Sequence, residues 1–119
     1  MTTDIYWMLE TEIKAGEIDQ LKILMSEMVS ATEAEEPGTV NYEWFVSADE
    51  STCHIYERYA DSAALMRHLG NFGEKFAKRF MSILQPSRMM VYGEPTDEVI
   101  AALSALNAEF MAPLGGFNR

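Results

Sequence analysis

The sequence predicts an α+β fold with one antiparallel sheet and its main helices on one face of that sheet. Apolar residues alternate with period two in four separate segments, which is typical of half-buried strands. Between these segments they recur at helical spacing, and glycine or proline stands at most junctions. At 119 residues the chain is long enough for one core and too short for two.

The first half of the chain reads as strand, helix and hairpin. A strand is expected over residues 5–13, and helical spacing begins at Glu17 after Gly16. The apolar stripe of this helix consists of Ile18, Leu21, Met25, Met28 and Thr32, with Leu24 and Val29 beside it. Pro37-Gly38 ends the helix, and alternation over residues 40–47 and 53–59 predicts two hairpin-connected strands. The helix is expected to end in solvated acidic residues, namely Glu33, Glu35 and Glu36.

The second half reads as helices followed by a fourth strand. Asp61 is a plausible N-cap for a short helix, which Gly70 and Gly73 are expected to interrupt. Pro86 is expected to stop a further helix, and residues 88–92 read as a strand. The stripe of that helix is Phe72, Phe76, Phe80, Ile83 and Leu84. Thr96 is expected to cap a last helix, whose stripe is Val99, Leu103, Leu106 and Phe110.

The resulting order, β-α-β-β-α-β, is that of the ferredoxin-like fold. We expect residues 1–93 to form this domain and residues 94–119 to form a helical extension packed on it. Such a sheet leaves one face without helices, and an aromatic face of this kind predicts a homodimer that pairs two sheet faces. The residues expected on that face include Tyr6, Met8, Phe45 and Tyr56.

Composition excludes several classes of partner and site. Nine Lys and Arg against nineteen Asp and Glu give a net charge of −10, which disfavours nucleic acid and anionic membrane surfaces. One cysteine, Cys53, cannot form an intrachain disulfide, and the start of the chain lacks a signal-peptide pattern, so we expect a cytoplasmic protein. With two histidines and this one cysteine, no metal site is expected.

Several short motifs resemble those of the antibiotic biosynthesis monooxygenase (ABM) family. They are EPGTVNYE at 36–43, YERYAD at 56–61, AAL at 63–65 and HL at 68–69. The resemblance covers about residues 4–93 and implies a dimeric α+β barrel with a pocket between sheet and helices. It also implies cofactor-free oxygenation of quinols or phenols, or, in a subset of the family, haem degradation.

The departures from the family pattern disfavour the haem-degrading activity. Leu9, Tyr59 and Lys78 stand where the haem-degrading members carry Asn, Trp and His. We therefore expect no cofactor. Quinol-oxidising relatives often carry a second histidine after the one that matches His68, whereas residues 70–73 of this chain contain none.

The candidate site combines helix-facing strand residues with one histidine from the following helix. A phenol reacts with oxygen without a cofactor if it is held as its anion in a dry aromatic pocket. We expect His68 or Glu57 to accept the proton, as the catalytic residues. The expected substrate-binding residues are Tyr42 and Tyr59 as hydroxyl donors, and Trp7 and Trp44 as apolar walls.

Each of these residues also has a structural interpretation. Glu57 suits a structural ion pair, His68 suits a surface position on its helix, and the aromatic residues suit the core. Two functions therefore remain open. One is a cofactor-independent monooxygenase that acts with O2 on a small aromatic quinol or phenol. The other is a non-catalytic dimeric module that binds or senses a small ligand.

Overall fold

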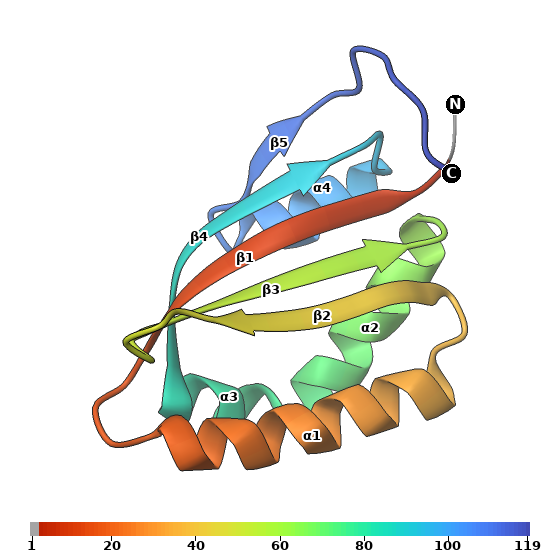
Figure 1. Cartoon of the computed structure of the whole chain (residues 1–119). Coiled ribbons are helices and arrows are strands. Elements are labelled where there is room, and N and C mark those ends of the chain that lie inside the picture. Colours follow the sequence, from red (N-terminus) through yellow and green to blue (C-terminus); the bar gives the residue numbers. More distant parts are fainter. Residues whose placement is uncertain (1–2) are drawn as a thin grey trace.

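The computed structural model describes residues 3–119 and confirms the predicted α+β architecture (Figure 1). The four predicted strands are β1 (Ile5–Ile13), β2 (Thr39–Val46), β3 (Thr52–Tyr59) and β4 (Leu84–Tyr92), and a short β5 (Glu109–Met111) joins them. The helices are α1 (Ile18–Glu35), α2 (Ser62–Lys75), α3 (Ala77–Ile83) and α4 (Asp97–Ser104).

The sheet has the strand order β2-β3-β1-β4-β5. The first four strands pair antiparallel, as the sequence predicts. The sequence analysis missed β5, which pairs parallel to β4 and makes the sheet mixed. The sheet of the single chain is not closed into a barrel.

All four helices lie on one face of the sheet (Figure 1). Two apolar clusters fill the space between helices and sheet. One joins β1, β3 and β4 to α2 and α4, through residues such as Leu65 and Leu103. The other joins the sheet to α1 and α3, through residues such as Leu24 and Phe80. Leu9 packs against both clusters and so lies at the boundary between them.

Two predicted boundaries around α2 and β4 are wrong. Gly70 and Gly73 do not interrupt α2, because each glycine costs a helix only about 1 kcal/mol and the capped, partly buried helix tolerates that cost. Pro86 lies within β4, opposite Thr11. A register shift between Glu10 and Thr11 marks a β-bulge there, and bulges accommodate a proline that cannot donate to the ladder.

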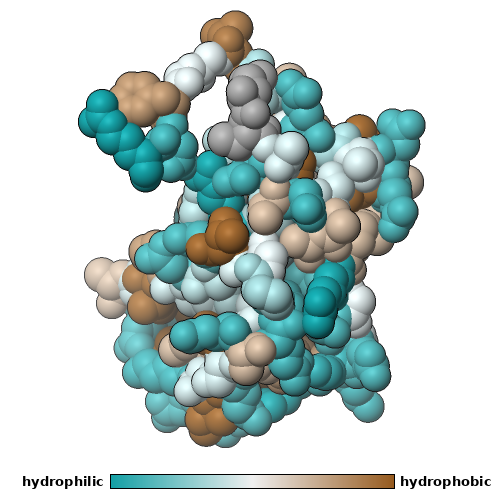
Figure 2. All heavy atoms as spheres, turned by 90° about the vertical axis from the view of Figure 1, so that its right-hand side faces the viewer, coloured by the Kyte–Doolittle hydropathy of each residue, from teal (hydrophilic) through white to brown (hydrophobic). Residues whose placement is uncertain are grey.

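The C-terminal extension also differs from its prediction. The last helix ends at Ser104, so Leu106 and Phe110 do not continue its stripe. Phe110 instead belongs to β5, which adds a strand beside β4. The segment after Met111 stands clear of the rest of the surface at the top of the molecule (Figure 2), and Leu114 and Phe117 are exposed there.

The other face of the sheet carries no helix. Tyr6, Tyr56 and Tyr92 form a contiguous aromatic group on it, with ring centroids 5.4–6.1 Å apart. Phe45 is 52% exposed on the same face. We call this surface the open face. Within residues 3–119, no helix is long and apolar enough to cross a membrane.

Candidate functional site

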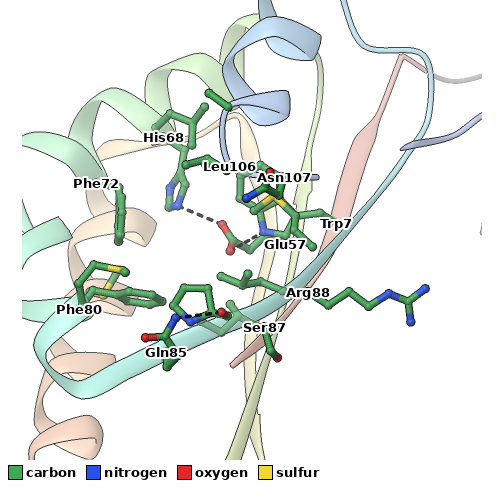
Figure 3. Close-up of a pocket in the computed structure, with 18 of the residues that line it drawn as sticks. Trp7, Glu57, His68, Phe72, Phe80, Gln85, Ser87, Arg88, Leu106 and Asn107 are labelled. Atoms are coloured by element: carbon green, nitrogen blue, oxygen red, sulfur yellow. Dashed lines mark hydrogen bonds and ion pairs between the residues drawn. The ribbon is translucent and has the colours of Figure 1, made fainter. Parts of the chain in front are cut away.

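A pocket of about 410 Å³ lies on the helix-covered side of the sheet, between the sheet, the helices and the end of α4 (Figure 3). Its walls are mainly apolar and aromatic, with a few polar groups. Among the lining residues are Trp7, Leu9, Met28, Tyr42, Ile55, Glu57, His68, Phe72, Phe80, Met89 and Leu106. Most ligand pockets share this composition, an apolar wall with a small number of placed polar groups.

Glu57 is the buried carboxylate of the pocket, and it comes from the middle of β3. Strand alternation places Glu57 on the helix-covered face, opposite Trp7 on β1 and Tyr42 on β2. Trp7 Nε1 donates to its Oε2 at 2.7 Å. The hydroxyl of Tyr59 donates to its Oε1, and His68 Nε2 contacts the same oxygen at 3.0 Å. Three donors on one carboxyl group are the arrangement that an ionised carboxylate requires when it is buried.

His68 projects from α2 toward Glu57 (Figure 3). Asp61 caps the start of this helix by accepting from the Ala64 amide at 2.8 Å. Leu65 and His68, three residues apart, are the buried residues of the helix, so its packing face carries the imidazole into the core. A surface position for His68 is therefore wrong.

A second carboxylate holds the other side of the imidazole. His68 Nδ1 lies 2.7 Å from Glu36 Oε1, in the turn between α1 and β2. Thr39 Oγ1 donates to the same oxygen, and Asn71 Nδ2 donates to Oε2. Glu36 is 5% exposed, so the predicted solvated position for it is wrong.

The turn reaches α2 because it contains Gly38. A Cβ on Gly38 would lie 2.6 Å from the Cβ of Ala64, which is closer than side chains pack. Ala64 and His68 lie one helical turn apart on the same side of α2. The close approach of Gly38 to Ala64 therefore brings Glu36 to His68.

The two carboxylates determine the protonation of the imidazole. Burial by itself lowers the pKa of His68, but the hydrogen bonds and charges of Glu57 and Glu36 outweigh burial and raise the pKa to about 9. Burial likewise works to raise the pKa of Glu36, but its bonds to Asn71, His68 and Thr39 hold that pKa below the ordinary value. At neutral pH His68 is therefore an imidazolium, held between Glu36 and Glu57.

The predicted aromatic residues occupy different places. Trp7 and Tyr42 line the pocket, and the ring of Tyr42 lies 5.4 Å from that of His68. Tyr59 is fully buried behind Glu57. Trp44 lies beside the pocket, packed between Tyr42 and Phe80. Burial, followed by the charge of Glu57, raises the pKa of both tyrosines, so both are neutral hydroxyl donors.

The structure thus brings together Glu57, His68, Trp7, Tyr42 and Tyr59, and leaves Trp44 at the side. The sequence analysis missed Glu36 and Asn71. Their positions in the EPG motif and two residues before Gly73 were visible, but only the folded turn shows that Asn71 donates to Glu36 and that Glu36 contacts His68. It also missed the wall formed by residues 105–107.

The site is suited to proton transfer. Glu57 Oε1 receives two donors, whereas Oε2 receives one, from Trp7, among the contacts within residues 3–119. A carboxylate oxygen has two acceptor positions, so Oε2 can accept one more hydrogen bond, from a ligand. No group of three or more His, Cys, Asp or Glu side chains in the described part of the chain is placed to hold a metal ion.

Comparison with models of protein families identifies the family of this chain. The model for antibiotic biosynthesis monooxygenases matches residues 5–72, more than half of the sequence, including Trp7, Glu36, Glu57 and His68. The chain belongs to this family. A sequence comparison with curated proteins found no match.

Several solved structures have a similar fold and cover this chain to different extents. MupZ from Pseudomonas fluorescens is 20% identical with a TM-score of 0.83, over 99% of this chain and 96% of that chain. A conserved protein from Methanosarcina mazei is 14% identical with a TM-score of 0.67, over 76% and 92%. SnoaB, a cofactor-independent oxygenase from Streptomyces nogalater, is 13% identical with a TM-score of 0.66, over 80% and 96%. These likenesses support a monooxygenase-type fold, and the match to MupZ includes the extension after residue 93.

Proposed function

We propose that this protein is a cofactor-independent monooxygenase that acts on a small aromatic phenol or quinol. The observation that carries the proposal is the free acceptor position on Glu57 Oε2, inside a pocket with apolar and aromatic walls. The family supports the class of reaction, and SnoaB, a cofactor-independent oxygenase, shares the fold.

In this proposal Glu57 accepts the proton of the substrate. The sequence leaves that role open between His68 and Glu57, but His68 is already protonated at neutral pH and has no lone pair to offer. The substrate hydroxyl donates to Glu57 Oε2, and its proton moves to the carboxylate. The phenolate then lies beside the His68 imidazolium, which takes over as its counter-charge.

The phenolate can then react with oxygen without a metal or flavin. It gives one electron to O2, and the resulting superoxide and phenoxyl radical combine by forming a C–O bond at a free ring carbon. Glu57 returns its proton to the peroxide, the O–O bond breaks and the ring carbon loses its hydrogen. One oxygen atom remains in the quinone and the other leaves as water, so phenol and O2 give quinone and water. Tyr42 lines the pocket as a hydroxyl donor for the oxygenated anion.

The test is oxygen uptake with a panel of phenols and quinols by the wild type and by Glu57→Gln. Removing a general base costs about 10²–10⁴-fold in rate, so we expect uptake by the variant to fall at least about a hundredfold. Glu10→Gln is the matched control, because Glu10 lies on the open face and contacts His54 and Arg88. Uptake that persists in Glu57→Gln, or a wild type that oxidises no member of the panel, would refute the proposal.

A second candidate function is that of a non-catalytic ligand-binding module. It is favoured by the three protein donors that already hold Glu57, since a structural carboxylate is satisfied in the same way. This function predicts a raised melting temperature with phenols and no oxygen consumption. In either case we propose a homodimer that buries the open face, because Tyr6, Met8, Phe45 and Tyr56 otherwise leave an aromatic surface in water.

A further inference from the structure

The C-terminal extension forms part of the pocket wall. Ala105, Leu106 and Asn107, which follow α4, line the same pocket as Glu57 and His68. Figure 3 shows Leu106 and Asn107 on the α4 side of the pocket and Phe72 and Phe80 on the side of α2 and α3. A ligand in the pocket is therefore enclosed by the family domain and by the extension together.

The turn that carries Leu106 is held by backbone hydrogen bonds. The Ala108 amide donates to the carbonyl of Leu103 at 3.1 Å, and the Asn107 amide donates to that of Ser104 at 3.0 Å. Asn107 has φ +61°, in the left-handed region. These are the hydrogen bonds and the conformation of a Schellman motif, in which Asn107 is the left-handed residue.

Both ends of this turn are anchored. Leu103 is fully buried in the core cluster beneath α4. After the turn, Phe110 of β5 pairs with Val91 of β4, and the Gly93 amide donates to the Met111 carbonyl at 3.2 Å. The position of Leu106 over the pocket is thus set by a hydrogen-bonded turn between two fixed elements.

The fold itself gives no reason for a leucine at position 106. In a Schellman motif an apolar contact joins two residues on either side of the turn, which are here Leu103 and Ala108. Ala108 packs against the core cluster that contains Leu103. Leu106 is 57% exposed although it lines the pocket, which places its side chain at the mouth. An apolar side chain held at a pocket mouth is available to contact a ligand that extends beyond the interior.

We propose that Leu106 is a specificity-determining residue that selects aromatic ligands by their length. The inference rests on the proposed function for the position of the ligand hydroxyl at Glu57. A one-ring phenol anchored there occupies only part of the 410 Å³ pocket and leaves the mouth at Leu106 empty. A ligand with three fused rings reaches the mouth and covers the Leu106 side chain.

The experiment measures binding of phenol, naphthol and hydroxyanthracene by equilibrium dialysis under nitrogen, so that no turnover occurs. Burying a leucine side chain is worth at least about tenfold in an equilibrium constant. We therefore expect Leu106→Ala to weaken binding of hydroxyanthracene about tenfold and leave binding of phenol unchanged. Leu106→Phe, which narrows the mouth, is expected to exclude hydroxyanthracene and still bind phenol.

Leu114→Ala is the matched control, because Leu114 is an exposed leucine of the same extension outside the pocket wall. It is expected to change none of the three affinities. Equal effects of Leu106→Ala on phenol and hydroxyanthracene, or no effect on either, would overturn the proposal. A wild type that binds none of the three ligands would overturn it as well.

The outcome is separable from that of the proposed function. Length-selective binding that depends on Leu106, without oxygen uptake in air, refutes the oxygenase and supports the specificity residue. Oxygen uptake with unaltered length selectivity in Leu106→Ala supports the oxygenase and refutes the specificity residue.

Discussion

The two faces of the sheet are formed by alternate residues of the same strands, yet a charged side chain is stabilised differently on each face. On the covered face Glu57 is 3% exposed and accepts hydrogen bonds from Trp7 and Tyr59. Its neighbour Arg58 lies on the open face, pairs with Asp4 at 2.6 Å and lies 4.8 Å from the ring centroid of Tyr6. A polar group on the covered face must be satisfied by the protein, whereas one on the open face is partly satisfied by water.

The difference indicates what each face can do. The covered face keeps Glu57 and the His68 imidazolium buried, where an electrostatic interaction is stronger than in water. The open face combines weaker ion pairs with aromatic surface, which is typical of a surface that another protein covers.

The largest expected effect is on the free energy of unfolding. It is measured by comparing single alanine substitutions of two adjacent residues that point to opposite faces. Trp7 is 2% exposed, and Trp7→Ala leaves a cavity and an unpaired Glu57 Oε2, so we expect a loss of about 3–5 kcal/mol in the free energy of unfolding. Tyr6 is half-buried, and Tyr6→Ala should cost about 1 kcal/mol. Urea unfolding at one fixed protein concentration measures both values. Equal losses would contradict the difference between the faces.

A smaller effect is expected from pH, through the buried imidazolium. The folded-state pKa of His68, about 9, lies above its ordinary value of 6.5. The contribution of His68 to the free energy of unfolding is therefore complete below about pH 6.5 and is lost as pH rises through about 9. It is on the order of 3 kcal/mol in total. Glu36 has a lowered pKa, so its contribution is present above its ordinary value of 4.5 and is lost as pH falls below that value.

The measurement is the free energy of unfolding of the wild type and of His68→Gln between about pH 6 and pH 9.5. The wild type should be more stable than His68→Gln at the low end of this range, and the difference in free energy of unfolding should shrink as pH rises. The ring protons of His68, followed by NMR in His54→Gln to leave one histidine, report the same pKa directly. A midpoint near the ordinary value would show that the two carboxylates do not stabilise the imidazolium.

The sequence predicted the covered face in part and for clear reasons. Period-two alternation was enough to place Trp7, Tyr42 and Glu57 on one face, because a strand allows only two directions. The motif around residues 36–43 indicated the family, and the periodicity of the segments indicated the order of strands and helices independently of it. Glu36 itself was misjudged, because a glutamate at a helix end is usually solvated and only the contact of Gly38 with Ala64 buries it.

The extension was the part that sequence patterns predicted least well. Leu106 and Phe110 continue the helical spacing of Val99 and Leu103, so periodicity could not show where α4 ends. The end is set by a left-handed Asn107 and by the pairing of a three-residue strand with β4, which is a tertiary interaction. The pocket wall depends on that ending, and it was therefore outside the reach of sequence patterns.

The smallest expected effect concerns the open face and again uses two adjacent residues. Phe45 and Val46 are 52% and 53% exposed. Phe45 lies on the open face, whereas Val46 lies opposite the buried Cys53 and points to the helix-covered face. If two open faces meet in a homodimer, Phe45→Ser removes an aromatic contact from the interface, which costs about 1–2 kcal/mol, or about tenfold in the dimer dissociation constant. Val46→Ser removes a side chain of similar exposure from the helix-covered face and should leave the dissociation constant unchanged. Sedimentation equilibrium measures all three proteins. A wild type that is monomeric at micromolar concentration would show that the open face does not pair two copies. Equal weakening by both variants would show that exposure, and not the open face, decides the effect on the dissociation constant.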